Sequence, residues 1–240
     1  MAQGRRLQIK LRHYPAIYLL DVLVLLLLKD VRHAATDVHE SPARSLMGGL
    51  RYVWSNQTVL VLLLIAALLN MLAAPYRYAF LPVFSRYILD TGPTGYGMLT
   101  AMAGVGALVA GLWVVSLGNF KHKGRLLVRA SFAWPASLLL FAMSTWYCVS
   151  LALVFVAGLT QAIVWTVIAT LILSHTAQSM RGRVMGLRTG VVFSLPIGNL
   201  LAGALAEHFS APLAQAAYAV TTMALMLGIM LLVPSLHRLE

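Results

Sequence analysis

Few side chains in the apolar parts of this chain can do chemistry, and those few are amides and aromatic rings. Asn70 lies deep inside the uncharged run 58–76, and Tyr76 ends that run. Gln161 and Trp165 stand four residues apart in a later apolar run, so on a helix they share one face. We predict that Asn70, Tyr76, Gln161 and Trp165 line a cavity for a small molecule. The alternatives are an interhelical hydrogen bond for Asn70 and helix packing for Gln161 and Trp165.

A second group of candidates is basic and lies between apolar runs. It comprises Lys121, Lys123 and Arg125 in one short segment and Arg181 and Arg183 in another. Clusters of this kind first of all hold membrane loops in the cytoplasm. A second role, as contacts of a cytoplasmic gate, is a hypothesis for these five residues.

Enzyme motifs are not found. The chain has no Walker lysine motif, no His-Glu-x-x-His and no Gly-x-Ser-x-Gly, and Gly104-Val-Gly106 lacks the third glycine of a dinucleotide loop. The single cysteine, Cys148, excludes an internal disulfide and a multi-cysteine metal site. We therefore expect no catalytic residue, no cofactor and no metal.

The composition indicates a membrane protein. Of 240 residues, 60% are hydrophobic and only 10% are charged, whereas soluble domains average about 25% charged residues. The formal net charge of +11 comes from short basic clusters between apolar runs, which suits loops at an anionic membrane surface better than a nucleic-acid partner.

Bilayer thickness fixes the number of spans, because a helix of about 20 residues crosses the hydrocarbon core. The uncharged run 130–173 would form a helix of about 66 Å, so it must fold back near Ser144-Thr-Trp-Tyr147. The predicted fold is an all-α, polytopic membrane protein with a six-helix transmembrane bundle in residues 41–240. The predicted spans are 58–76, 96–117, 126–143, 148–173, 184–206 and 213–233.

The first 40 residues form a separate predicted unit, with a basic tail and a short apolar segment, 14–28, that contains Asp21. Lys and Arg alternate cleanly between loops: three loops on one side are basic, and those on the other carry only Arg77 and Arg86. This alternation places both ends of the six-span unit in the cytoplasm and predicts a multi-pass protein of the cell membrane. A crossing by 14–28 would put the basic tail outside, so we expect that it does not cross as a normal span.

The order of six spans, with Lys123-Gly-Arg125 after the second and Met180-Arg-Gly-Arg-Val-Met-Gly-Leu187 between the fourth and fifth, resembles the C-terminal half of a major facilitator superfamily transporter. More narrowly, it is similar to drug and siderophore exporters of the drug:proton antiporter type. The motifs of that subgroup are Gly48-Gly-Leu-Arg-Tyr-Val-Trp54, Ala74-Pro-Tyr76, Leu81-Pro-Val-Phe84 and Gly92-Pro-Thr-Gly95. The resemblance covers about residues 41–240.

The resemblance implies efflux of a small molecule by alternating access, with this bundle as one half of a secondary transporter. Its partners would be the lipid bilayer, the substrate, and a second six-helix half or a second copy of the chain. The segment 14–28 resembles a damaged sixth helix, and Asn119 stands where the family's loop motif has an acidic residue. The six predicted spans contain no carboxylate, so a coupling group would belong to the other half. The alternative is a truncated, non-transporting protein that acts as an interaction partner or is an inactive remnant.

Overall fold

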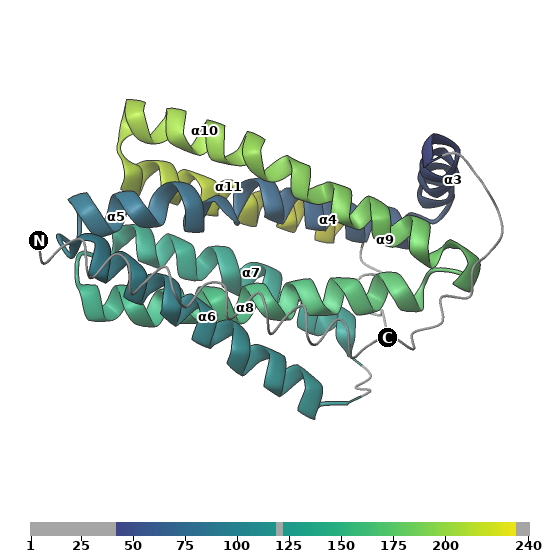
Figure 1. Cartoon of the computed structure of the whole chain (residues 1–240), viewed down its shortest axis with the longest axis horizontal. Helices are drawn as coiled ribbons and strands as arrows, with labels where there is room; N and C mark the ends of the chain where they lie inside the picture. The colour runs from purple at the N-terminus through teal and green to yellow at the C-terminus, as the bar shows by residue number, and fades with distance from the viewer. Residues whose placement is uncertain (1–41, 119–121, 234–240) are drawn as a thin grey trace, which may run out of the picture. The chain divides into compact units, whose positions relative to one another are not determined.

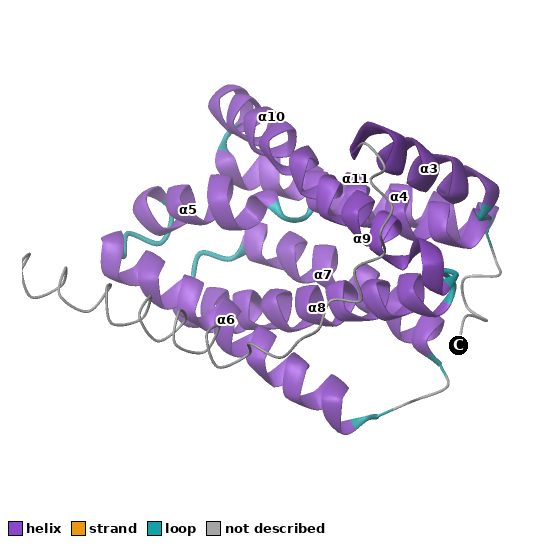
Figure 2. Ribbon diagram, turned by 45° about the vertical axis from the view of Figure 1, so that its right-hand side comes forward, coloured by secondary structure: helices purple, strands orange, loops and turns teal. Residues whose placement is uncertain are grey.

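A computed structural model describes residues 42–118 and 122–233. The chain divides between Glu40 and Ser41 into two units, and the described residues all belong to the second. The predicted segment 14–28, Lys121 and Asn119 therefore lie outside the described residues. Every regular element in the described part is a helix, and it contains no strand (Figures 1 and 2).

Six helical stretches of the described part are long and apolar enough to cross a membrane. They are built from α4 (Gln57–Leu72), a π-helical turn η1 (Tyr76–Phe80) and α5 (Leu81–Tyr87); α6 (Gly92–Ser116); α7 (Lys123–Met143); α8 (Tyr147–Ser174); a short η2 (Gln178–Met180), α9 (Arg181–Gly190), a 3-10 turn η3 (Val191–Phe193) and α10 (Ser194–Phe209); and α11 (Ala211–Leu232). The predicted all-α, six-span architecture is confirmed.

The first span is longer than the prediction 58–76, since the helical stretch runs from Gln57 to Tyr87. Pro75, near the end of the predicted span, lacks an amide hydrogen, but its φ of −57° and ψ of −19° remain right-handed helical. The helix therefore widens without stopping, and the Leu81 amide donates to the Tyr76 carbonyl, five residues back. Arg77, counted above as a loop charge, lies within this stretch.

The fifth span is also longer than its prediction, 184–206, because the helical stretch covers Gln178–Phe209. It is interrupted by η3, just before the start of α10. Pro196 has no amide hydrogen to offer the carbonyl four residues earlier, that of Val192, so a regular helix loses a hydrogen bond at this place. The 3-10 turn η3 lies directly on the N-terminal side of this position.

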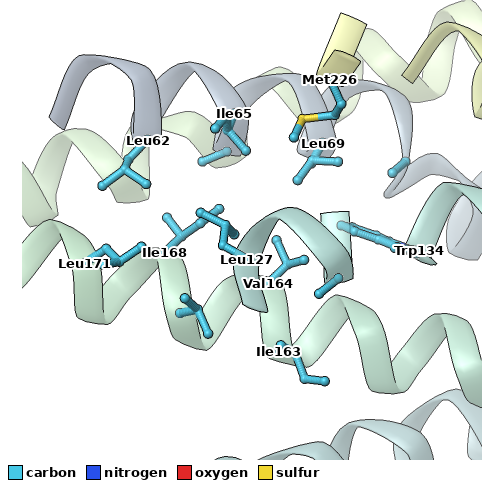
Figure 3. Packing of buried hydrophobic residues seen from close by; sticks show 14 of the residues in the cluster. Leu62, Ile65, Leu69, Leu127, Trp134, Ile163, Val164, Ile168, Leu171 and Met226 are labelled. Carbon is cyan, nitrogen blue, oxygen red and sulfur yellow. The ribbon is translucent and has the colours of Figure 1, made fainter. Parts of the chain in front are cut away.

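The larger core cluster joins α4 to α7, α8 and α11 (Figure 3). Leu62, Ile65 and Leu69 of α4 are fully buried and face Val164 and Ile168 of α8. In lipid the hydrophobic effect adds little to such contacts, because hydrocarbon tails are as apolar as leucine, so dense van der Waals packing must hold the helices together.

Helices α6 and α8 approach each other closely, and small residues make this possible. A Cβ atom on Gly158 would clash with the Ala103 carbonyl, and one on Gly106 would clash with the Phe155 carbonyl. Ala103, Ala107 and Gly111 recur every four residues, as in a stripe of small residues, but only Ala103 among them is buried. A Cβ on Gly111 would meet nothing within 4 Å, and the buried stripe instead runs through Gly106 and Ala110.

Helix α3 (Pro42–Ser55) lies at the end of the bundle that carries the α6–α7 and α8–α9 loops, here called the basic end (Figures 1 and 2). The Tyr52 hydroxyl accepts a hydrogen bond from the Ala177 amide at 3.1 Å, and the Asn56 side chain donates to the His175 carbonyl at 3.1 Å. These bonds fasten α3 to the α8–α9 loop. Its Leu46 and Trp54 stay exposed, as suits a helix that lies in a membrane interface.

The α6–α8 contact gives a stability test with a matched control. We expect Gly158→Ala to destabilise the purified protein by about 1 to 3 kcal/mol, because the new methyl group presses on the α6 backbone. Gly111→Ala, which adds the same group in open space, should leave the melting temperature in detergent unchanged or slightly higher. Equal melting temperatures for the two variants would show that the contact is not close-packed.

Candidate functional site

A cavity of about 310 Å³ lies where α4 and η1 meet α8 and the α9–α10 stretch. This volume is at the lower end of the range for small-molecule sites, about 300 to 1,000 Å³. Three of the four predicted cavity residues, Asn70, Gln161 and Trp165, line it together. They come from α4 and α8, so the fold brings together side chains that are about 90 residues apart in the sequence.

Tyr76, the fourth candidate, is not among the lining residues and is almost fully buried. Its hydroxyl donates to the Gln161 side-chain oxygen at 3.3 Å. The hydrogen bond joins η1 to α8 and holds the Gln161 amide in one orientation. Tyr76 therefore acts on the cavity indirectly, by positioning the side chain of Gln161.

Asn70 connects α4 to the interrupted fifth span. Its side-chain nitrogen donates to the Val191 carbonyl at 3.1 Å and lies 3.2 Å from the Ser194 hydroxyl. Pro196 has no amide hydrogen for the Val192 carbonyl, and the Asn70 nitrogen lies 3.5 Å from that oxygen. The Val191 carbonyl also accepts from the Ser194 amide and hydroxyl, so Asn70 adds an interhelical donor to a backbone that has few alternatives in lipid. The interhelical hydrogen bond given above as the alternative for Asn70 is present, on the wall of the cavity.

Two arginines that sequence reasoning did not place in the cavity, Arg77 and Arg188, line it as well. Arg188 donates from Nη2 to the Trp165 carbonyl at 3.3 Å, and its guanidinium carbon lies 5.8 Å from the centre of the Trp165 ring. This distance is within the range of a cation–π contact. The sequence could have identified Arg188 as a candidate, because it falls inside the predicted span 184–206. A charged residue within a membrane span is by default a candidate for a functional site.

The charge of these arginines is not balanced by any acidic side chain that the structure describes. The two described acidic residues are Asp90, between α5 and α6, and Glu207, near the end of α10. Both lie at the end of the bundle opposite the basic end (Figure 1). A charged arginine at the centre of a bilayer costs about 2.5 to 3.5 kcal/mol on insertion scales, so a cavity with two of them requires water or an anion.

The predicted gate residues that are described belong to two helices. Lys123 and Arg125 begin α7, and Arg125 lines a separate cavity of about 320 Å³ beside Trp113. Arg181 and Arg183 begin α9; the Arg181 Nε donates to the Thr176 carbonyl at 3.4 Å, and Arg183 packs against the glycines of α3. All four lie at the basic end, and Lys121 is outside the described residues.

The Asn70 hydrogen bonds can be tested against a second asparagine. We expect Asn70→Ala to lower stability by about 0.6 to 1.7 kcal/mol, the range measured for interhelical hydrogen bonds in membranes. Asn199→Ala is the control, because the Asn199 side chain forms no hydrogen bond with the described residues. Unfolding in mixed micelles would measure both, and a larger loss for Asn199→Ala would contradict this role of Asn70.

Comparison with known proteins identifies the family of this chain. Neither the curated proteins nor the solved structures contain a match to the chain. A family model described as a transmembrane secretion effector matches residues 13–239. Proteins of this kind are membrane transporters and not enzymes, and the match covers nearly the whole sequence together with all six spans. The chain therefore belongs to the transmembrane secretion effector family of the major facilitator superfamily.

Proposed function

We propose that this protein exports a small molecule as one six-helix half of a secondary transporter, and that the cavity of Asn70, Gln161 and Trp165 is its part of the substrate site. Membership of the family supports a role in membrane transport. Export, the C-terminal-half identity and the antiporter mechanism are our proposals. The observation that supports them most is a polar cavity that lies deep within the bundle and opens at its surface.

The depth of the cavity suits a substrate site. Gln161 is thirteen residues before the end of α8 at Ser174, which corresponds to about 20 Å along the helix. Trp165 is nine residues before it, about 13 Å. Both values lie near the middle of a hydrocarbon core of about 30 Å, where secondary transporters bind their substrates between two bundles.

The surface opening suggests that a second body covers the cavity. Tyr78 and Thr189, at its mouth, are exposed, and the walls behind them carry amide and guanidinium groups. Such groups face a bundle interior or water and rarely lipid. We propose that another six-helix half, or a second copy of this chain, packs over this face.

Two interrupted helices border the cavity and would allow it to change shape. The π-helical turn η1 supplies Arg77 and Tyr78, and the 3-10 turn η3 supplies Val192. Broken helices of this kind form the binding sites of many transporters, and π-turns are frequent at functional sites. Movement at both turns would open the site alternately to the two sides of the cell membrane.

The basic end would face the cytoplasm, and Lys121, Lys123, Arg125, Arg181 and Arg183 would contact the second half at the inner gate. No described carboxylate lines the cavity. If a proton drives the cycle, the group that binds it would therefore come from the second half.

Efflux from cells tests the proposal. Cells that express the chain, alone or with the N-terminal six-helix half of a family member, would be loaded with anionic, neutral and cationic fluorescent dyes. We expect efflux of at least one dye above the empty vector. Gln161→Ala should reduce that efflux at least fivefold at equal surface expression, because it removes a polar group from the cavity wall.

Ser116→Ala is the control, since Ser116 is exposed at the end of α6 and its hydroxyl bonds only its own helix. The absence of efflux in both settings would overturn the transport proposal and favour a non-transporting remnant or interaction partner. Efflux that is insensitive to Gln161→Ala would leave transport standing and remove this cavity from it.

A further inference from the structure

We propose that the cavity binds an organic anion, through Arg77 and Arg188. This inference rests on the proposed function for its biological meaning, because it names the class of substrate. The binding itself can be measured without transport. The proposal depends on the two guanidinium groups, their partners, and the charges around them.

The two arginines reach one cavity from different elements. Arg77 belongs to η1 and Arg188 to α9, and both line the same space as Gln161. The Nε atom of each is buried and has no hydrogen-bond partner among the described residues. Buried donors are satisfied in the great majority of native structures, so these two nitrogens indicate a missing acceptor.

Arg188 is held so that most of its donors stay available. One nitrogen, Nη2, donates to the Trp165 carbonyl at 3.3 Å, and the Trp165 ring lies beside the guanidinium carbon at 5.8 Å. A guanidinium has five N–H donors in a fixed, planar arrangement. A group held on one side in this way loses little further freedom when it binds a carboxylate or a phosphate with two parallel hydrogen bonds.

Within residues 42–118 and 122–233, no acidic side chain lies near the two arginines. Neither arginine forms an ion pair within the described residues, and Asp90 and Glu207 lie at the far end of the bundle (Figure 1). A lipid phosphate would remain at the membrane surface, whereas Trp165 is nine residues inside the end of α8. We therefore infer that the acceptor is a soluble anion that enters the cavity; a carboxylate of a second half is the alternative that the assembly experiment below separates from it.

The other walls define the rest of the ligand. Trp165 and Tyr78 supply aromatic surface, Val192 and Leu195 supply apolar surface, and Gln161 supplies an amide. A volume of about 310 Å³ is enough for a single small ring with its charged group. The cavity therefore fits an aromatic or otherwise largely apolar organic anion.

Equilibrium binding tests the inference with two probes of equal size. The full chain in neutral phosphatidylcholine nanodiscs would be titrated with 4-nitrobenzoate and with uncharged 4-nitrobenzamide, using quenching of tryptophan fluorescence. We expect saturable quenching by 4-nitrobenzoate, with a dissociation constant at least tenfold below that of the amide. Trp165→Phe should remove most of the saturable signal, because Trp165 is the tryptophan in the cavity.

Substitutions then assign the preference to the two arginines. Arg77→Gln and Arg188→Gln should each weaken 4-nitrobenzoate at least tenfold and leave 4-nitrobenzamide within twofold, and Arg188→Lys should restore part of the loss. Arg129→Gln, at an exposed position outside the cavity, is the matched control and should change neither probe. Gel filtration would confirm that each variant is folded. The Arg77 side chain has no hydrogen bond with the described residues to lose, so Arg77→Gln keeps the test valid if Arg188→Gln is unstable.

Equal affinities for the two probes would overturn the inference. An anion preference that survives both arginine substitutions, or that is lost in Arg129→Gln, would also overturn it. So would loss of 4-nitrobenzoate binding when the N-terminal half is assembled on the chain, because the arginines would then pair with protein carboxylates. A chain that binds the anion without exporting any dye would overturn only the transport proposal, and export restricted to cationic dyes would overturn only the anion inference.

Discussion

Asn70 donates its amide to the Val191 carbonyl, and the rest of the site depends on this bond. A membrane offers no water to an interrupted helix, so each carbonyl that leaves the regular pattern must find a donor within the protein. The fifth span is interrupted at η3, just before Pro196, and the Asn70 amide of α4 reaches the Val191 and Val192 carbonyls there. The first span is thereby joined to the fifth where the fifth is irregular, six residues before η1 begins in the first.

Close contacts with neighbouring helices hold the cavity wall on α8 in place. Gly106 and Gly158 let α6 and α8 pack backbone to backbone, and the leucine-rich face of α4 packs on the other side of α8. Because α8 is fixed on both sides, Gln161 and Trp165 have a rigid support. The irregular turns η1 and η3 face them across the cavity. A rigid wall opposite two broken helices is an arrangement in which small backbone movements change the shape of a site.

Length and apolarity predicted the six spans, since a bilayer accepts only helices within a narrow range of lengths. Asn70, Gln161 and Trp165 could be predicted as a group because polar and aromatic side chains are conspicuous in apolar runs. Arg77 and Arg188 were missed because arginines near the predicted ends of spans were counted as loop charges. The turns η1 and η3, beside Pro75 and Pro196, were not predicted because a proline in an apolar run can end, bend or widen a helix. The side of α6 that contacts α8 was not predicted either, because it depends on the angle at which the two helices cross. A single sequence does not contain that angle.

The most direct test of the central claim, that a water-accessible and positively charged site lies among these helices, is cysteine labelling at Thr189, an exposed residue of the cavity wall. In a Cys148→Ser background, Thr189→Cys would be exposed in membranes to matched anionic and cationic methanethiosulfonate reagents, with Leu200→Cys on the apolar surface of α10 as the control. The account expects labelling of Thr189→Cys, several-fold faster with the anionic reagent, and little labelling of Leu200→Cys. Equal labelling of both positions, or faster reaction of Thr189→Cys with the cationic reagent, would contradict it.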